Sequence, residues 1–347
     1  MEEGIEIGTL MYIGRRLVLS VFVLLGLSIF IFTLSRVIPG DPARLSLGPM
    51  APQWAVDQLR ERLHLNEPLP VQYVIWLTNA IHGDFGESIV TKRPVILDVI
   101  TFFPASLELV LLSTIVSTVL AIVIGAISGR RANSWFDNAF RLFSYIGIAV
   151  PTFVWAIMAL FLFGYVWKIL PTMGQLSTNI APPPTITGMM GLDALLTGNI
   201  TAFLDHFRYM LMPAFAMSIG RIAQEARILR SGFIENLKKD YITAEVSYGI
   251  PERSITFKYL MKPSLIPMIS ILGMDIAASM GGSFIIETIF NWPGFGRYGM
   301  WAMLNKDLNA IIAVVVIIGA FFAISNIVVD LIIASVDPRI RMMERGA

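Results

Sequence analysis

The sequence predicts an all-α, multi-pass membrane protein, and three observations support this fold class. Of its 347 residues, 55% are hydrophobic and only 15% are charged, a balance far from that of a soluble globular domain. The mean hydropathy is positive. Six stretches are apolar enough to be read as helices that cross a hydrocarbon core of about 30 Å. The net charge of +1 gives no indication of nucleic-acid binding, and the absence of cysteine excludes disulfides and thiolate metal sites.

In chain order, the six predicted spans are 17–38, 106–128, 142–170, 209–223, 265–290 and 310–334. The first is too long for a signal peptide, and an acidic leader rather than a basic one precedes it. The third contains Pro151, which predicts a kink. The fourth span is short and only weakly hydrophobic, whereas the fifth is long and the apolar run of the sixth is uninterrupted.

The distribution of lysine and arginine predicts that both termini are cytoplasmic. With that orientation, the inner segments 1–16, 129–141, 221–263 and 335–347 hold 16 basic residues in 85 positions. The outer segments hold 10 in 133. The higher density inside agrees with the positive-inside rule.

The regions outside the spans predict how the chain is divided. Segment 1–38 contains the N-terminus and the first span, and 39–105 is too polar to cross the membrane, with helix-like signals near 53–63. We expect 39–105 to form an extracytoplasmic cap. Segment 106–334 is the predicted transmembrane core with a cytoplasmic loop at 238–267, and 335–347 is the predicted cytoplasmic tail.

That cytoplasmic loop is unusually charged for so apolar a chain. Asp240 is placed to cap a helix that begins at Tyr241, Gly249 to end it in a left-handed conformation, and Pro251 to start a second short helix. The predicted structure is a helix, a break and a helix at the membrane face. Its apolar residues are candidates to bury against another protein; alternatively, the loop is a solvated connector that rests on head groups. These residues are Ile242, Val246, Ile250, Ile255 and Phe257.

The polar loop motifs resemble those of a known family, from about residue 12 to 341. The motifs are LSRVIPGDPARLSLG (34–48), LRERLHLNEPLPVQYVIWL (59–77), GDFGESI (83–89), FPASLELVLL (103–112), ETIFNWPGFGR (287–297) and VDLIIASVDPRIR (329–341). They are similar to those of ABC importer permeases of the dipeptide, oligopeptide and nickel family, specifically the first, B-type subunit. The cytoplasmic loop resembles the EAA motif of such permeases: Ala244 and Gly249 match, whereas Thr243 and Glu245 depart from it.

The resemblance implies the type I ABC importer permease fold, with six spans, in the cell membrane. The partners it implies are a homologous C-type permease, two cytoplasmic ATPases and an extracytoplasmic substrate-binding protein. It also implies that the loop is a coupling helix that docks on an ATPase through Tyr241, Ala244, Glu245, Gly249 and Pro251. The chain has no G-x-x-x-x-G-K-[ST] phosphate loop, so we expect no enzymatic activity and no cofactor here, with ATP and Mg²⁺ on the partner subunits.

Ionisable residues inside spans are expensive and therefore candidates for function. We expect Glu108 to have a structural role near the outer surface and Asp330 to be a helix-packing contact. Asp275 lies deep in the fifth span with Ser279 and Gly282 on the same helical face, which predicts either a translocation pathway or a partnered packing residue. The histidines His64, His82 and His206 lie far apart and are predicted to be ordinary surface residues.

A secondary transporter driven by an ion gradient is the alternative from a different functional class. Such proteins often show inverted repeats or paired broken helices, and no convincing repeat relates residues 1–170 to 171–347. Within the importer class the substrate stays open. Peptides are the first choice, and oligosaccharides or nickel are the alternatives.

Overall fold

The computed structural model describes residues 2–37, 41–48 and 50–336, and in this part of the chain the only extended pairing is an isolated bridge between Glu87 and Pro94. Of the predicted tail 335–347, all but the first two positions lie outside the described residues. The first helices are α1 (Glu2–Val37), α2 (Pro42–Leu47), α3 (Gln53–Arg62), α4 (Leu69–Ile81), α5 (Val95–Arg130), α6 (Trp135–Ala149) and α7 (Thr152–Ala159). The others are α8 (Met190–Leu196), α9 (Ile200–Asn236), α10 (Asp240–Ser247), α11 (Glu252–Ser254), α12 (Met261–Ile289), α13 (Phe295–Leu304) and α14 (Leu308–Val336). The fold is all-helical, as predicted.

Four helical segments in the described residues are long and apolar enough to cross a membrane: Gly14–Val37, Val95–Arg130, Glu252–Ile289 and Leu308–Ile332. A fifth candidate is the pair of α6 and α7, the latter continued by a π-helical turn (Leu160–Val166) and bent from α6 by 104°. The bend occurs because Pro151 lacks an N–H group and forces the preceding Val150 into an extended conformation. The kink predicted at Pro151 is thus confirmed.

The predicted fourth span, 209–223, is only the middle of a much longer helix. α9 has 37 residues, and charged side chains such as Arg208 and Arg221 interrupt its apolar run, so its hydropathy falls below that of the four long segments. The predicted span ends at residue 223, whereas the helix continues to Asn236.

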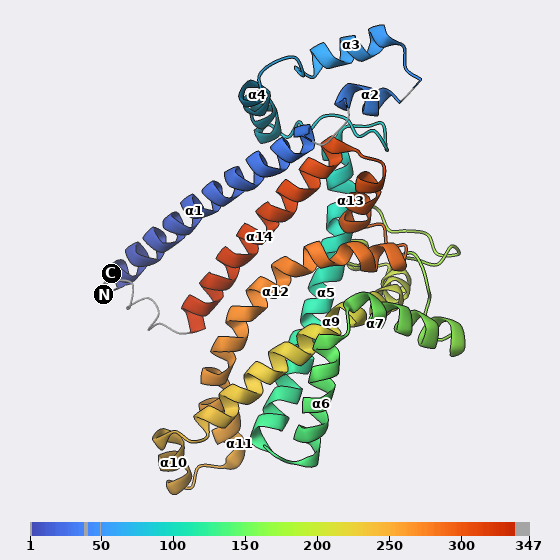
Figure 1. Ribbon diagram of the computed structural model, residues 1–347. Coiled ribbons are helices and arrows are strands. Elements are labelled where there is room, and N and C mark those ends of the chain that lie inside the picture. Colours follow the sequence, from blue (N-terminus) through green and yellow to red (C-terminus); the bar gives the residue numbers. More distant parts are fainter. Residues whose placement is uncertain (1, 38–40, 49, 337–347) are drawn as a thin grey trace.

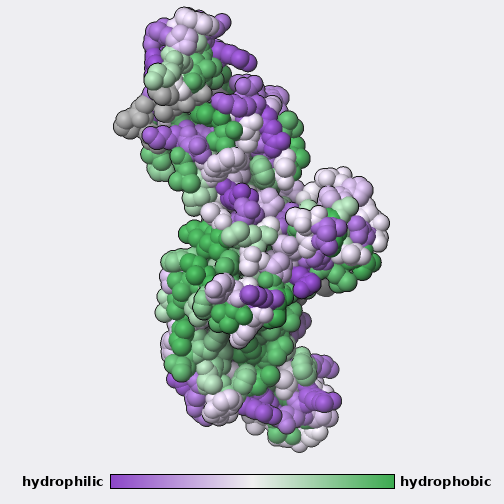
Figure 2. Space-filling model, turned by 90° about the vertical axis from the view of Figure 1, so that its right-hand side faces the viewer, coloured by the Kyte–Doolittle hydropathy of each residue, from purple (hydrophilic) through white to green (hydrophobic). Residues whose placement is uncertain are grey.

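The long helices lie side by side in the order α1, α14, α12, α9 and α6, with α5 packed behind α9 and α12 (Figure 1). The short helices α2, α3, α4 and α13 gather at the upper end, and α10 and α11 lie at the lower end (Figure 1). An ion pair of 2.6 Å between Arg130 and Glu252 links the end of α5 to α11. Seen from the side of α6, the lower half of the surface is largely hydrophobic above a hydrophilic lower end (Figure 2).

The helices α5 and α9 approach each other at backbone distance. A Cβ atom added to Gly125 would lie 2.8 Å from the carbonyl oxygen of Ala226, and one added to Gly129 would lie 3.0 Å from that of Arg230. Only glycine permits such an approach, which small residues commonly provide between membrane helices. The largest buried cluster forms around this pair, where α5 and α9 meet α7 and α12.

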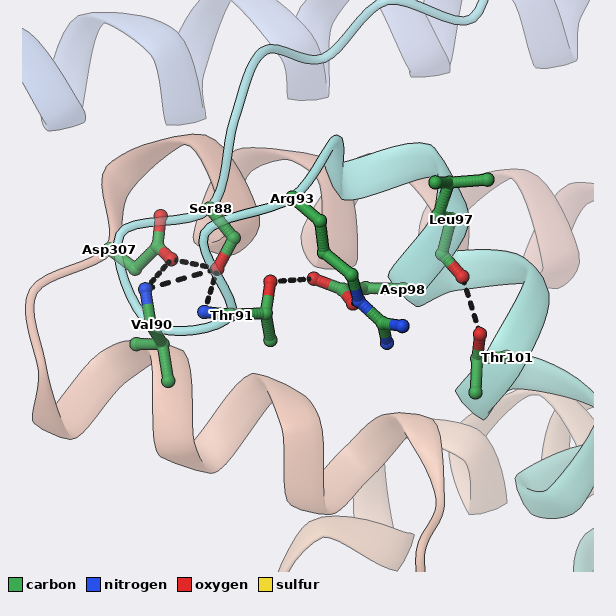
Figure 3. Close-up of polar contacts among 8 residues, drawn as sticks. All are labelled: Ser88, Val90, Thr91, Arg93, Leu97, Asp98, Thr101 and Asp307. Carbon is green, nitrogen blue, oxygen red and sulfur yellow. Dashed lines mark hydrogen bonds and ion pairs between the residues drawn. The ribbon is translucent and has the colours of Figure 1, made fainter.

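Polar contacts attach the loop before α5 to the upper end of the helices (Figure 3). The hydroxyl of Ser88 donates to Asp307, between α13 and α14, at 2.6 Å. Thr91 and Arg93 both donate to Asp98 at 2.6 Å, and Asp98 is fully buried. The loop therefore belongs to the same packed unit as α5 and α14, and α5 itself begins at Val95, before the boundary predicted at residue 105.

The motif ETIFNWPGFGR forms the anchor of α13. The buried carboxylate of Glu287 accepts hydrogen bonds from the hydroxyl of Ser106 and from the backbone N–H of Arg297, the latter at 2.8 Å. Ser106 in turn accepts from the N–H of Phe295 at 2.7 Å. These acceptors satisfy N–H groups that the first turn of a helix leaves without partners. The indole of Trp292 donates to the carbonyl of Ala105 at 3.0 Å and completes the contact with α5.

The second glycine of this motif allows a close contact that predicts a large effect of substitution. A Cβ atom at Gly296 would lie 2.9 Å from the Cα of Phe284, which belongs to α12 and cannot move aside. We expect Gly296→Ala to lower the free energy of unfolding by about 1–3 kcal/mol. Thermal unfolding in detergent measures this, with Gly281→Ala as the control because nothing lies within 4 Å of its added methyl group. Equal stability of the two variants would contradict the packing argument.

Candidate functional site

The segment predicted as a coupling helix forms a turn at the lower end of the molecule. α10 begins at Asp240 rather than at Tyr241, and no side chain caps it, so the predicted capping role of Asp240 is wrong. Gly249 has a φ of +73°, which confirms its predicted left-handed conformation. The N–H of Ile250 bonds to the carbonyl of Glu245 at 3.2 Å, as in a Schellman ending, and this turn reverses the chain.

The second predicted short helix differs from the expectation. Pro251 precedes α11 rather than beginning it, and α11 continues through a π-helical turn (Ile255–Leu260) into α12 without a break. Pro267 lies inside α12. The segment is therefore one surface helix, α10, followed by the lower end of a long membrane helix.

The apolar residues of this segment divide into two groups. Ile242 and Ile255 are 3% exposed and pack against other residues of this chain. The expectation that these two side chains become buried against another protein is therefore wrong. Val246 and Phe257 are exposed, and so is Tyr248. Val246 and Tyr248 lie at the end of α10 and Phe257 lies at the lower end of the long membrane helix, so exposed large side chains on both sides of the turn offer a surface suited to a protein partner.

The predicted contact residues lie on the same turn. Tyr241 is partly exposed, and its hydroxyl donates to Asn236 at 3.2 Å. Burial raises the pKa of Tyr241 above its ordinary value, so the hydroxyl stays neutral and able to donate. Ala244 is exposed and Glu245 is half-buried. Tyr241, Ala244, Glu245, Gly249 and Pro251 thus lie on α10 and the turn that directly follows it, within eleven consecutive residues.

The second group of predicted residues lies on α12. Asp275 and Ser279 are half-buried, whereas Gly282 is exposed and has open space around it. The Oδ2 atom of Asp275 is buried and has no hydrogen-bond partner among the described residues. The hydroxyl of Ser279 donates to the carbonyl of Asp275 at 2.5 Å.

A half-buried arginine, Arg221, joins this group from α9. Its guanidinium donates to Ser279 at 2.9 Å, to Thr114 at 3.0 Å and to Ser113 at 2.7 Å. Ser113 lies near the middle of α5, so Arg221 lies at a similar depth. The three hydroxyls come from two helices, α5 and α12, and hold the guanidinium between them.

Glu225, one turn along α9 from Arg221, completes the cluster. It is fully buried; its Oε1 lies 3.4 Å from the hydroxyl of Ser117, and its Oε2 has no partner among the described residues. The charge of Arg221 interacts with the carboxylates of both Glu225 and Asp275. We call Arg221, Glu225 and Asp275 the charged cluster; with both acids ionised its net charge is negative.

Sequence reasoning missed Arg221 and Glu225 because it ended the fourth span at 223 and counted Arg221 among the cytoplasmic residues. A signal was present, since an arginine and a glutamate four residues apart lie on one face of a continuous helix. The structure shows that α9 continues past these residues, so the face that carries Arg221 and Glu225 packs against other helices instead of lying in water.

Three further predictions concern Glu108, His206 and Asp330. Glu108 accepts from the N–H of Gly191 at 2.8 Å and lies 3.2 Å from His206, in agreement with a structural role. His206 is fully buried and bonds to the carbonyl of Gln175 at 2.9 Å, so its predicted place on the surface is wrong. Asp330 forms an ion pair of 3.2 Å with Arg16 between α14 and α1, which confirms it as a packing contact.

A buried carboxylate, Asp193, organises the loop before α8. It accepts from the N–H groups of Ile186, Thr187 and Gly188 and from the hydroxyl of Thr187. Burial alone would raise the pKa of Asp193, but these hydrogen bonds favour the charged form and hold the pKa below its ordinary value. Its contribution to stability is therefore present at neutral pH and is lost as the pH falls through that lowered pKa.

Within the described residues, no group of three or more histidine, aspartate or glutamate side chains is arranged to hold a metal ion. The chemistry that the site offers is charge and hydrogen bonding. The charged cluster can bind polar groups at membrane depth, and the turn around Gly249 can bind a protein.

Comparison with known proteins places this arrangement in a family. The family described as binding-protein-dependent transport system inner membrane component matches residues 121–342, and its N-terminal companion matches residues 9–110. The chain is 35% identical over 320 residues to a probable D,D-dipeptide transport system permease protein of Escherichia coli (strain K12), covering 92% of this chain and 94% of that protein.

Two other relatives agree with this. A dipeptide transport system permease protein of Alkalihalophilus pseudofirmus is 32% identical over 96% of this chain and 99% of its own length. An oligopeptide transport system permease protein of Bacillus subtilis (strain 168) is 34% identical over 95% and 98%. The family model covers more than half of the chain, and these relatives match it almost from end to end. The chain therefore belongs to the family of binding-protein-dependent transport system inner membrane components, as a non-enzymatic multi-pass permease subunit.

Proposed function

We propose that this chain is one half of the translocation pathway of an ABC importer for peptides. Its relatives are permeases of dipeptide and oligopeptide transport systems. The observation that carries the proposal is the turn around Gly249, which presents Val246, Tyr248 and Phe257 at one end of the molecule. A permease that does not hydrolyse ATP needs such a surface to dock an ATPase, whose ATP-driven movement changes the conformation of the permease.

The proposed topology has six spans, with both termini in the cytoplasm. α9 is the fourth span although its hydropathy is low, because its charged residues Arg221 and Glu225 face other helices instead of lipid. The higher density of basic residues in 221–263 and the other predicted inner segments supports a cytoplasmic location of α10 and the turn. The helices α2 to α4 then form an extracytoplasmic cap, which would meet a substrate-binding protein.

The proposed partners supply the ATP-binding sites, for which this chain has no motif, and the second half of the pathway. We propose a second, homologous permease that completes the pathway and two ATPases that carry ATP and Mg²⁺. Tyr241, Ala244 and Glu245 would contact one ATPase, while Gly249 and Pro251 set the turn. ATP-driven movement at this turn reaches the charged cluster through the continuous helix Glu252–Ile289.

The charged cluster is the proposed pathway site. Asp275 is half-buried with an unpartnered oxygen, and Gly282 on the same helix is exposed. The buried Oδ2 of this carboxylate has no hydrogen-bond partner among the described residues, which supports a water-filled path at the interface with the second permease. Asp275 would contact hydroxyl or amine groups of the passing substrate there.

The function is tested with the whole complex reconstituted into vesicles. We expect uptake of labelled peptides that requires ATP, the binding protein and both permeases. A matched series of oligosaccharides should not be taken up. Uptake by this permease alone, without an ATPase, would refute the importer assignment, whereas ATP-dependent uptake of sugars only would refute the substrate.

Replacement of Asp275 tests the pathway role. We expect Asp275→Asn to slow peptide transport about tenfold, since a charged hydrogen bond to substrate becomes a neutral one. Assembly and basal ATP hydrolysis should be largely kept, and Asp275→Leu should be at least as slow. Ser270→Ala is the control, because Ser270 is exposed and bonds only to the carbonyl of Ile266. Failure of both Asp275 variants to assemble, or unchanged transport, would assign Asp275 to packing or to no role.

A further inference from the structure

A basic pocket lies between α6 and α9, and none of its lining residues belongs to the charged cluster or to the turn. Its volume is about 370 Å³. Seven side chains line it: Phe140, Arg141, Ser144 and Tyr145 on α6, and Arg227, Arg230 and Ser231 on α9. Three arginines and two serines with aromatic walls are a donor-rich lining suited to an anion.

One of the three arginines is already neutralised. Arg230 binds Asp137 through both Nε and Nη2, the latter at 2.7 Å. Asp137 is fully buried and also accepts from the hydroxyl of Ser128 and the N–H of Asn133. Four donors occupy this carboxylate, so it has no free capacity for another arginine.

The other two arginines are uncommitted. Arg141 and Arg227 are exposed, and neither forms an ion pair or side-chain hydrogen bond with any residue in the described ranges. With the charges of Arg230 and Asp137 cancelling, the pocket carries two positive charges, Arg141 and Arg227, that have no acceptor among the described residues. An anion of matching size would supply the missing acceptors.

The pocket lies at the depth of lipid head groups. Arg141 is six residues from the start of α6 at Trp135, and Arg230 is six from the end of α9 at Asn236. At 1.5 Å per residue both are about 9 Å from the lower helix ends. The interfacial layer of a bilayer is about 5–8 Å thick on each side, so long arginine side chains at this level reach it.

The surface beside the pocket is suited to acyl chains. On α6, exposed Leu142 lies one turn before Tyr145 of the pocket wall, and exposed Phe143 and Ile146 continue the apolar surface around the helix. Trp135, at the lower start of α6, is 83% exposed, as in an aromatic belt at a membrane interface. From this side, Figure 2 shows hydrophobic surface directly above the hydrophilic lower end.

We propose that this pocket binds the phosphate head group of an anionic phospholipid from the cytoplasmic leaflet, with the acyl chains along α6. Basic pockets between membrane helices on the cytoplasmic side recognise such head groups. Free phosphate offers the same oxygen acceptors but no acyl chains for the adjacent apolar face. The choice of leaflet rests on the proposed topology, while binding itself is measurable without leaflets and does not depend on the transported substrate.

The test is native mass spectrometry of the complete complex, with all its subunits, in detergent. Phosphatidylglycerol is added and compared with phosphatidylcholine and with inorganic phosphate as a competitor. We expect selective retention of phosphatidylglycerol, with affinity reduced about fivefold by Arg141→Gln and again by Arg227→Gln. Both residues are exposed and unpaired, so the variants should fold. Arg131→Gln is the matched control. Arg131 directly follows α5 and lies outside the pocket, so this variant should bind phosphatidylglycerol as the wild type does.

Each other outcome overturns the proposal. Equal binding of phosphatidylcholine means that no head group is recognised. Displacement of the lipid by inorganic phosphate at the same concentration identifies a free-anion site. Loss in Arg131→Gln as large as in Arg141→Gln shows only a general effect of charge, and absence of retained lipid shows that another subunit covers the pocket. ATP-dependent peptide uptake measured in parallel keeps these results separate from a failure of the transport assignment.

Discussion

A complex that carries Gly249→Pro is expected to reach the membrane but to lose its ATPase. Gly249 has a φ of +73°, whereas proline is fixed near −65°, so the chain cannot reverse at this position. Proline also removes the N–H group that bonds to the carbonyl of Val246 at 3.0 Å. We expect co-purified ATPase to fall to background while the amount of permease in the membrane stays at the wild-type level.

A matched variant makes this result specific. Asparagine tolerates the left-handed conformation, so Gly249→Asn should keep most of the ATPase. Ala244→Asp is a second test, because Ala244 is exposed and its replacement should disturb a partner rather than this chain. Recovery of the ATPase at wild-type yield with Gly249→Pro or Ala244→Asp would disprove the proposed role of the turn.

Removal of the carboxylate of Asp137 is expected to have the largest effect on stability. Asp137→Ala leaves the half-buried guanidinium of Arg230 and the donors of Ser128 and Asn133 without an acceptor. Breaking a buried ion pair by removing one partner costs about 3–5 kcal/mol. Denaturant unfolding of the purified complex in mixed micelles measures the loss.

The ion pair between Arg130 and Glu252 provides the comparison. It is as short as 2.6 Å, but Glu252 is 77% exposed, so Glu252→Gln should cost no more than about 1 kcal/mol. If the two variants lose the same stability, burial is not what makes the Asp137 pair strong. Asp137→Asn together with Arg230→Gln should recover part of the loss, since no charge is then left unpaired.

Local features of the sequence were sufficient to predict much of this fold. Apolar runs gave most membrane helices, Pro151 gave the bend, and Gly249 gave the left-handed turn, because each depends on residues within a few positions. The boundary of α9 was not predictable in this way. A window of hydropathy stops at Arg221, whereas the helix continues since its charges meet partners on other helices.

The candidate site shows the same limit more strongly. Asp275 could be selected because a carboxylate inside an apolar run is unusual by itself. Its neighbour Arg221 acquires meaning only from Ser113, 108 positions earlier, and Ser279, 58 positions later. His206 was likewise predicted to be a surface residue, because its contacts with Gln175 and Glu108 join positions that are far apart in the sequence. Such long-range contacts have no signature in one sequence.

The backbone contact between α5 and α9 limits how this subunit can change shape. At Gly125 and Gly129 the helix α5 contributes no side chain to the contact with α9, and an added Cβ atom would meet the backbone of Ala226 or Arg230, so little room remains for sliding. The two helices must travel as one rigid body. Outside this contact, α6 and α7 meet at a corner of 104°, and Gly281 and Gly282 of α12 have no neighbouring atom within 4 Å of an added methyl group. The charged cluster connects these two parts of the subunit. Arg221 and Glu225 lie on α9, in the close pair with α5, whereas Asp275 lies on α12, the helix that contains Gly281 and Gly282.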